Sequence, residues 1–193
     1  MRVFLAGATG VIGIRLLSLL VRAGHVVAGM TRSPQRATGI AALGGEPIVC
    51  DVFDAELLTE AVVGFAPEAV VHQLTDLPDT LAELPEHTAA NDRMRTEGTR
   101  NLVAAAQAAG AGRFVAQSIA WRPAGCGRAV EVHERQVLAV GGVVVRYGRL
   151  YGPGTFYESE LPPPPRVQVD EAARATLPLL ETRSGIVTVV DPE

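Results

Sequence analysis

Three glycines near the beginning of the chain, Gly7, Gly10 and Gly13, follow the spacing G-x-x-G-x-x-G. An apolar run precedes them and a helix-like segment follows, which is the context of a loop that binds a dinucleotide phosphate. Glycine permits the tight turn and lets backbone amides approach the anion, and the start of a helix attracts negative charge. We therefore expect a pyrophosphate to contact the loop residues Gly7, Thr9, Gly10, Val11, Ile12 and Gly13.

The residues that follow the second apolar run indicate which dinucleotide is bound. A ribose-binding acid is expected about 20 residues after such a loop. The segment Met30–Arg36 contains no acid, and Arg32 stands where an acid would repel a 2′-phosphate. Arg36 follows one helical turn later. These two arginines predict that NADP(H) is preferred, with NAD(H) as the alternative cofactor if Arg32 is only a solvated surface base.

The charged residues limit the remaining chemistry. The 193 residues include 21 acids and 17 bases, and the net charge of −4 argues against a nucleic-acid partner. All 17 bases are arginines, so these residues offer no side-chain amine for catalysis.

Three further patterns bear on location and metals. The four histidines are scattered singly, so no metal site is expected. No apolar run reaches the roughly 18 residues of a membrane span. Cys50 and Cys126 are far apart and unpatterned, which favours a reducing compartment. We expect a cytoplasmic protein without a membrane partner.

Short apolar runs alternate with segments of helical periodicity along the whole chain. The expected strands are Arg2–Ala6, His25–Met30, Glu46–Cys50, Glu68–Gln73, Arg113–Gln117, Val143–Tyr147 and Ile186–Val190. The expected helices are Val11–Ala23, Pro34–Leu43, Ala55–Val63 with Asp54 as its N-cap, Glu86–Ala109, Ala129–Val140 and a last one from Asp170 to about Glu181. This alternation predicts one α/β domain over residues 1–193, a Rossmann-type, doubly wound parallel sheet of six to seven strands. Ligands of such sheets bind beyond the carboxyl ends of the strands.

Taken in order, these motifs resemble the extended short-chain dehydrogenase/reductase superfamily, in its NAD-dependent epimerase/dehydratase branch. The matching segments are Gly7–Gly13, Asp51-Val52, Val71–Thr75, Asn91 with Gly98–Leu102, Phe114–Ser118, Arg146 with Leu150–Gly154, and Val167–Ala173. The match extends over nearly the whole chain, and it is specific as a set although each later segment is weak alone.

The resemblance assigns roles to single residues. Asp51 and Val52 would line the adenine, and Gln73 and Thr75 would lie along the nicotinamide half. Tyr147 and Leu150 would approach the nicotinamide through the backbone, and Asn91 belongs to the same cofactor set. Ser118 would occupy the catalytic Ser/Thr position and donate a hydrogen bond to a substrate oxygen. Alternatively, Gln73 and Asn91 satisfy buried backbone groups, and Ser118 caps the end of a strand.

The chain departs from this family where proton transfer is concerned. Family catalysis uses a Tyr-x-x-x-Lys pair, in which the lysine lowers the pKa of the tyrosine. If Glu134 is the glutamate that usually follows that lysine by four residues, Val130 stands at the lysine position and Cys126 at the tyrosine position. His133 is a substitute donor, although a run such as His133–Arg135 is more typical of a solvated helix face.

The substrate-binding region is also much reduced, because residues 155–166 replace most of it. We therefore expect an atypical NADP(H)-dependent oxidoreductase acting on a small molecule. One alternative is a non-catalytic, NADP(H)-binding redox sensor, and another is a remnant chain that acts only as an interaction partner. The Ala-rich helix expected over Glu86–Ala109 is consistent with a homodimer, because this helix packs against its counterpart in the family.

Overall fold

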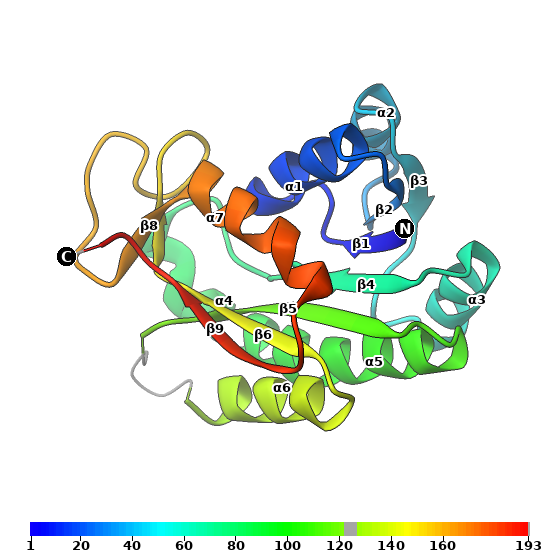
Figure 1. The fold of residues 1–193 in the computed structure, drawn as a ribbon. Helices are drawn as coiled ribbons and strands as arrows, with labels where there is room; N and C mark the ends of the chain where they lie inside the picture. The colour runs from blue at the N-terminus through cyan, green and yellow to red at the C-terminus, as the bar shows by residue number, and fades with distance from the viewer. Residues whose placement is uncertain (122–126, 193) are drawn as a thin grey trace.

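A parallel sheet of seven strands organises the chain (Figure 1). The computed structural model describes residues 1–121 and 127–192. The strands are β1 (Arg2–Ala6), β2 (Val26–Thr31), β3 (Glu46–Val49), β4 (Ala69–His72), β5 (Arg113–Ile119), β6 (Val143–Tyr147) and β9 (Gly185–Val189). Their order in space is β3-β2-β1-β4-β5-β6-β9. The order reverses between β1 and β4, which confirms the expected Rossmann-type topology and places the ligand crevice at that point.

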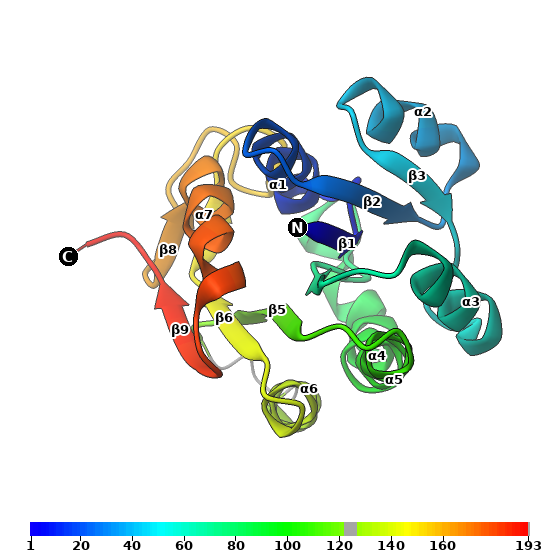
Figure 2. The same cartoon turned by 45° about the vertical axis from the view of Figure 1, so that its right-hand side comes forward.

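Helices cover both faces of the sheet, as Figures 1 and 2 show. On one face lie α1 (Val11–Arg22), α2 (Pro34–Ala42), α7 (Val169–Thr176) and the 3₁₀ turn η3 (Leu177–Glu181). On the other face lie α3 (Ala55–Phe65), α4 (Leu84–Arg93), α5 (Thr99–Ala108) and α6 (Gly127–Ala139). The five inner strands β2, β1, β4, β5 and β6 are mostly buried on both faces, which explains their nearly continuous apolar sequences, whereas the edge strands β3 and β9 are more exposed.

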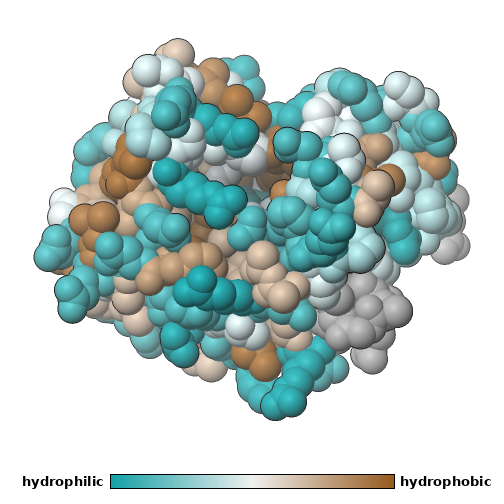
Figure 3. All heavy atoms as spheres, turned by 180° about the vertical axis from the view of Figure 1, so that it is seen from behind, coloured by the Kyte–Doolittle hydropathy of each residue, from teal (hydrophilic) through white to brown (hydrophobic). Residues whose placement is uncertain are grey.

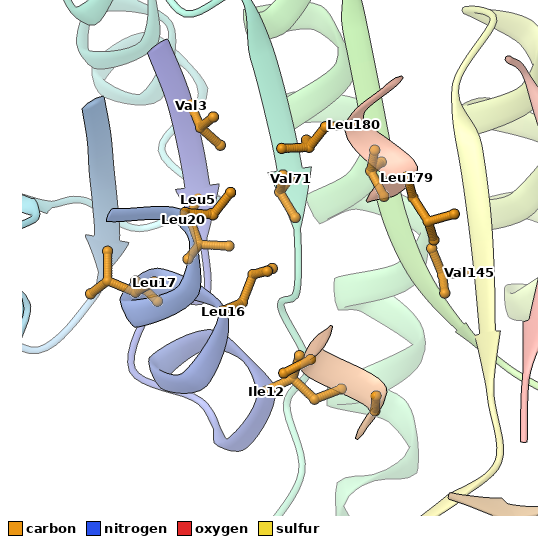
Figure 4. Close-up of a cluster of buried hydrophobic side chains, with 14 of the residues drawn as sticks. Val3, Leu5, Ile12, Leu16, Leu17, Leu20, Val71, Val145, Leu179 and Leu180 are labelled. Carbon is orange, nitrogen blue, oxygen red and sulfur yellow. The ribbon is translucent and has the colours of Figure 1, made fainter. Parts of the chain in front are cut away.

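The helix α1 is fixed on the sheet by one apolar face. Leu16, Leu17 and Leu20 recur at helical spacing and are at most 1% exposed. Figure 4 shows these side chains directed at residues of the central strands such as Leu5 and Val71. Truncating a leucine buried in this way costs about 2–5 kcal/mol, so this packing firmly fixes the helix that begins at the glycine loop.

The helix expected over Glu86–Ala109 is divided into α4, a π-helical turn and α5. A 3₁₀ turn, η1 (Leu81–Glu83), leads into α4, and a π-helical turn, η2 (Met94–Gly98), separates α4 from α5. A π turn adds a residue to the helical repeat and shifts the following side chains around the axis. Hydrophobic periodicity alone does not predict such a turn, because the apolar positions on either side remain compatible with one helix.

A second, two-stranded sheet lies outside the main one. It consists of β7 (Arg149–Tyr151) and β8 (Arg166–Gln168), which pair in parallel. The segment between them forms turns, with one isolated bridge between Tyr151 and Tyr157. Gln168 caps α7 by accepting hydrogen bonds from the backbone of Asp170 and Glu171. The sequence did not predict β7, whereas β8 and α7 overlap the Val167–Ala173 element of the family resemblance.

Candidate functional site

A cleft of about 1160 Å³ lies at the carboxyl ends of the strands. The loops after β1, β2, β3, β4, β5 and β6 all contribute residues to its walls. The loops after β1 and β4 meet where the strand order reverses. This is the position at which open α/β sheets bind their ligands.

The glycine loop forms one end of the cleft. Gly7 has a φ of +87°, and a Cβ atom on it would lie 2.8 Å from the carbonyl carbon of Gln73. A Cβ atom on Gly13 would lie 2.0 Å from the carbonyl oxygen of Gly7. Both positions therefore require glycine. Gly10 is the N-cap of α1 without a side-chain cap, and the first turn contains no acid. The amides at the start of α1 are thus suited to hold an anion.

Arg15 fastens this helix to a distant part of the chain. Its Nε donates to Asp170 Oδ1 at 2.5 Å, and its Nη2 donates to the carbonyl oxygen of Pro153 at 2.8 Å. Its Nη1 donates to the carbonyl oxygen of Val11 at 2.8 Å. The hydrogen bond from Arg15 lowers the pKa of the Asp170 carboxyl, which keeps this pair ionised. The first turn of α1 is therefore held from outside the glycine loop.

The loops after β2 and β3 form the next part of the cleft. Thr31, Arg32, Ser33 and Arg36 line it and include no acid. The Arg32 side chain is 63% exposed, and its Nη2 lies 3.2 Å from Asp76 Oδ1. Cys50, Asp51 and Val52 continue the wall, as the resemblance implied for the last two. Burial raises the pKa of the Cys50 thiol to about 11, so it stays protonated and unreactive.

Tyr147 and Gln73 lie at the floor of the cleft. Gln73 Nε2 donates to the Tyr147 hydroxyl at 3.2 Å, and this hydroxyl lies 2.5 Å from Thr176 Oγ1. Thr176 in turn donates to the carbonyl oxygen of Ala172, so the tyrosine is the donor toward Thr176. Burial raises the pKa of Tyr147 to about 12. Tyr147 therefore orients Gln73 rather than exchanging protons with a ligand.

Ser118 belongs to a group of three polar side chains, of which Ser118 and Glu134 are buried and Arg146 is partly exposed. Its hydroxyl donates to Glu134 Oε1 at 2.7 Å. Arg146 binds both carboxylate oxygens of Glu134, through Nε at 2.8 Å and Nη2 at 2.6 Å. Burial disfavours the charged carboxyl, but hydrogen bonds from Arg146 and Ser118 outweigh it and lower the pKa of Glu134. In this structure the proton of Ser118 is therefore directed at Glu134, and the hydroxyl presents an acceptor to the cleft.

A chain of hydrogen bonds through two buried histidines lies behind this floor. The Leu74 amide donates to His72 Nδ1 at 3.2 Å, and His72 Nε2 lies 3.0 Å from Thr99 Oγ1. Thr99 Oγ1 lies 2.7 Å from His133 Nδ1, and His133 Nε2 lies 2.7 Å from the carbonyl oxygen of Gln117. All donors point one way if both imidazoles are neutral. This series of hydrogen bonds thus connects the carboxyl end of β4 to the carboxyl end of β5 through Thr99 of α5 and His133 of α6.

Burial keeps both of these histidines neutral. It lowers the pKa of His72 well below its usual range, and it lowers the pKa of His133 to about 4. The expectation that His133–Arg135 forms a solvated face is wrong for His133, which is 1% exposed, and for Glu134. Ala129, His133 and Val137 recur every four residues on the inner face of α6. This spacing was the sequence signal for a buried histidine.

Most of the residues expected to bind the cofactor do line the cleft: Gly7, Thr9, Gly10, Val11, Ile12, Arg32, Arg36, Asp51, Val52, Gln73, Thr75, Asn91, Tyr147 and Leu150, together with Ser118. Gly13 instead packs against the loop backbone, and His133 lies behind the floor. Asn91 Oδ1 accepts a hydrogen bond from the Asp76 amide at 3.1 Å, so it satisfies a backbone group. Cys126 lies outside the described residues.

Sequence reasoning missed two parts of the wall. One is the segment around η1 and α4, including Leu77, Leu81 and His87, and the other includes Trp121 and Phe156. Their signal was weak, because single apolar or aromatic residues in loops have no period. Figure 3 shows one face of the molecule, on which hydrophobic residues are scattered among hydrophilic ones.

The described residues contain no group of three or more side chains placed to hold a metal ion. Nor does any helix in the described ranges combine the length and the apolar content that crossing a bilayer requires.

The fold and the glycine loop together define a Rossmann-type nucleotide-binding protein. More specifically, the chain belongs to the NAD(P)H-binding family, whose model matches residues 7–132. A 3-diazoavenalumate denitrifying reductase from Streptomyces sp is 43% identical over 182 residues, covering 81% of this chain and 59% of the relative. A 3-beta-hydroxysteroid dehydrogenase from Mycolicibacterium neoaurum is 31% identical over 114 residues, covering 59% of this chain and 31% of the relative. This chain therefore spans less than two thirds of either relative.

Solved structures share the fold. The UDP-glucose 4-epimerase of Thermus thermophilus, in complex with NAD, superposes with a TM-score of 0.80 at 21% identity, covering 100% of this chain and 78% of that one. The UDP-glucose 4-epimerase of Thermotoga maritima gives 0.81 at 16% identity, with 98% and 77% covered. The chain is thus NAD(P)-binding and oxidoreductase-like, and similar to NAD-dependent epimerases and to a reductase.

Proposed function

We propose that this chain is the cofactor-binding part of an NADP(H)-dependent reductase that transfers a hydride to a small-molecule acceptor without a Tyr–Lys proton donor. One contrast within the cleft supports this proposal most directly. The glycine loop offers backbone amides to an anion, whereas Ser118 and Tyr147 at the floor already hydrogen-bond to groups of the protein, Ser118 to Glu134 and Tyr147 to Gln73 and Thr176. Such a site holds the cofactor and leaves the chemistry to its hydride.

The loop after β2 supports a preference for NADP(H). Arg32 and Arg36 line the cleft there, and no acid of that loop is present to repel a 2′-phosphate. The Arg32 guanidinium is mostly exposed, so it can contact a phosphate while Asp76 holds it from one side. A charge-assisted contact of this kind gives about a 10- to 100-fold preference.

The floor of the cleft supports an acceptor that needs no proton. The sequence contains no lysine, and Val130 stands four residues before Glu134. The raised pKa of Tyr147 and the lowered pKa of His133 leave neither group able to donate a proton to a ligand near neutral pH. His87 of α4 also lines the cleft. An experiment must therefore ask whether its imidazole donates a proton to the acceptor.

The name of the Streptomyces relative describes reduction of a diazo compound with removal of nitrogen. That chemistry fits a site without a proton donor. An aryldiazonium ion accepts the hydride of NADPH, and the carbon–nitrogen bond breaks as dinitrogen leaves. The arene and NADP⁺ are the other products, and no external proton is consumed. We therefore take an aryldiazonium compound as the test acceptor.

The experiment follows NADPH absorbance after addition of an aryldiazonium salt, an aldehyde or a quinone. We expect turnover with the diazonium salt, release of dinitrogen, and deuterium on the ring when 4-deuterated NADPH is used. The rate should stay the same in the variant His87→Gln and show no titration near the pKa of histidine. NADPH binding without turnover of any acceptor would contradict the proposal and favour a redox sensor. Absence of NADPH binding would overturn it together with its cofactor preference.

A further inference from the structure

Three aromatic side chains line the part of the cleft formed by the segments that follow β5 and β7. The chain has one Trp, three Tyr and five Phe, so aromatic residues are scarce. Nevertheless Trp121, Phe156 and Tyr157 all line the cleft, and each is only partly buried. They come from the segments that follow β5 and β7. Partly buried aromatic rings beside a cavity offer flat apolar faces to a ligand.

Arg149 in β7 also lines the cleft and lies beside one of these rings. Its guanidinium carbon lies 5.0 Å from the centre of the Trp121 ring. Its Nη1 donates to the carbonyl oxygens of Pro163 and Pro164, at 3.2 and 3.0 Å. These contacts fix the guanidinium plane from one side, and they use one of its three nitrogens. A guanidinium fixed in this way needs little further ordering when it binds a planar anion.

The charge of Arg149 is not neutralised within the described residues. Carbonyl groups and an indole ring are its partners there, and no described carboxylate forms an ion pair with it. Other arginines behave differently, since Arg15, Arg146 and Arg166 each pair with an acid. A positive charge left over at the wall of a cleft is a binding feature for an anion.

Two apolar side chains also line this cleft. Leu77 and Leu81 are 44% and 41% exposed, so their apolar surface is accessible from the cleft. Together with the aromatic rings they would cover the body of a flat ligand, and its charged group would reach Arg149. Apolar walls with one fixed polar group are typical of small-molecule sites.

We propose that this end of the cleft binds a planar aromatic carboxylate, with Arg149 pairing with the carboxylate and Trp121, Phe156 and Tyr157 packing on the ring. This inference rests on the proposed function, because it names the substrate class of the same site. It differs from a nucleoside diphosphate, which carries several charges and would require more than the single fixed guanidinium of Arg149. An arginine fork and a carboxylate match in geometry, which gives the pair its specificity.

The test measures binding of three probes, trans-cinnamate, its neutral amide and 3-cyclohexylpropanoate, by calorimetry with and without NADP⁺. We expect cinnamate to bind best, because it is both planar and charged. In Arg149→Met, cinnamate affinity should fall about 10- to 100-fold while the affinity of the amide and of NADP⁺ stays unchanged. Arg135→Met is the matched control, since Arg135 lies on the exposed side of α6 and loses the same charge.

Further variants separate the ring from the charge. Trp121→Leu should weaken cinnamate and its amide alike, and Trp121→Phe should restore both, because the ring packs on the ligand whatever its charge. Equal binding of cinnamate and its amide, or unchanged cinnamate affinity in Arg149→Met, would overturn the inference. Tighter binding of UDP than of cinnamate would also overturn it. Failure of NADP⁺ binding with cinnamate still bound would instead refute the proposed function, and the two failures are therefore distinguishable.

Discussion

The two ends of the cleft are built on opposite principles. At the glycine loop, the groups available to an anion are backbone amides, and tight packing excludes a side chain at Gly7 and at Gly13. At the floor, the polar groups are side chains, and those of Ser118 and Tyr147 already have hydrogen-bond partners within the protein. One end is arranged to bind an anion, and the other is arranged to keep its shape.

This difference teaches where the function of the chain must be sought. Donors without intramolecular partners gain most from a ligand, whereas satisfied buried groups lose bonds if they engage one. Binding specificity is therefore expected at the amides of the loop and at the N–H groups of Arg32 and Arg149 that do not bond to Asp76, Pro163 or Pro164. The buried network instead determines the stability and the geometry of the floor. Variants at each end of the cleft can weaken or refine this contrast.

Gly13→Ala should have the largest effect. The new methyl group would lie 2.0 Å from the carbonyl oxygen of Gly7, so the loop and α1 must separate. We expect destabilisation of more than about 2 kcal/mol and loss of NADPH binding. Thermal unfolding and NADPH titration measure the two effects.

Two further glycine variants control this result. Gly39→Ala in α2 meets no atom within 4 Å, so it should leave NADPH binding unchanged and raise stability by about 0.5–1 kcal/mol through its higher helix propensity. In Gly10→Ala the nearest atom would be 3.4 Å away, so the protein should fold and yet bind NADPH less tightly. Normal NADPH binding by Gly13→Ala would show that the loop does not depend on this close packing.

The stability of the chain should fall as the pH decreases from about 6.5 to 4. The folded protein keeps His133 neutral with a pKa of about 4, because of burial first and the positive charge of Arg95 as well. The unfolded chain binds a proton near pH 6.5, so folding is favoured above that pH and the advantage is lost below it. The loss from His133 is on the order of 3 kcal/mol, and His72 acts in the same direction.

Chemical denaturation at a series of pH values measures this slope. The variant His133→Phe should flatten it, even though the variant is less stable overall. An unchanged slope in His133→Phe would show that His133 does not contribute to it. The Glu134 carboxyl, whose pKa is lowered, contributes a separate loss only at still lower pH.

Arg32→Ala should change the cofactor preference without affecting stability. The Arg32 side chain is 63% exposed, and its ion pair with Asp76 is at the surface of the cleft. We expect NADPH affinity to fall about 10- to 100-fold, while NADH affinity is unchanged. Titration with both cofactors gives the ratio, and Arg135→Ala controls for the loss of one positive charge. Equal losses for NADPH and NADH would assign Arg32 to the shared part of the dinucleotide.

Tyr147→Phe should have the smallest effect on the reaction. Removing the hydroxyl takes a donor from Thr176 and an acceptor from Gln73, which costs about 1 kcal/mol of stability. The turnover rate should fall far less than the about 10²- to 10⁴-fold that loss of a proton donor causes. Single-turnover kinetics with NADPH compares the variant with the wild type. A fall of the larger size would make Tyr147 a proton donor and remove the contrast between the two ends.

The regular parts of this architecture were predictable from local sequence. Apolar runs marked the seven strands of the main sheet, and Asp54 is the expected N-cap of α3, where it accepts from the Leu57 amide. The glycine spacing predicted the loop because positions without room for a Cβ atom must be glycine, and a glycine is visible in the sequence. The same holds for the position of Arg32 after β2, at the wall of the cleft.

The buried polar network was not predictable in the same way. His133 and Glu134 look like residues of a solvated helix, and only their partners Thr99, Ser118 and Arg146 make their burial favourable. These partners are far away in sequence, so no local pattern reports them. The π turn and β7 were missed for a related reason, since both depend on tertiary packing rather than on periodicity.

The three hydrogen bonds of Arg15 bear on how much of the chain holds α1 in place. The family match ends at residue 132, but Arg15 holds α1 through Pro153 and Asp170, both beyond that limit. A polypeptide cut at residue 132 would retain every matched residue and lose both of these anchors. The part of this protein that holds its first helix in place is therefore larger than the segment that the family match covers, because residues in the last third of the chain bond to Arg15.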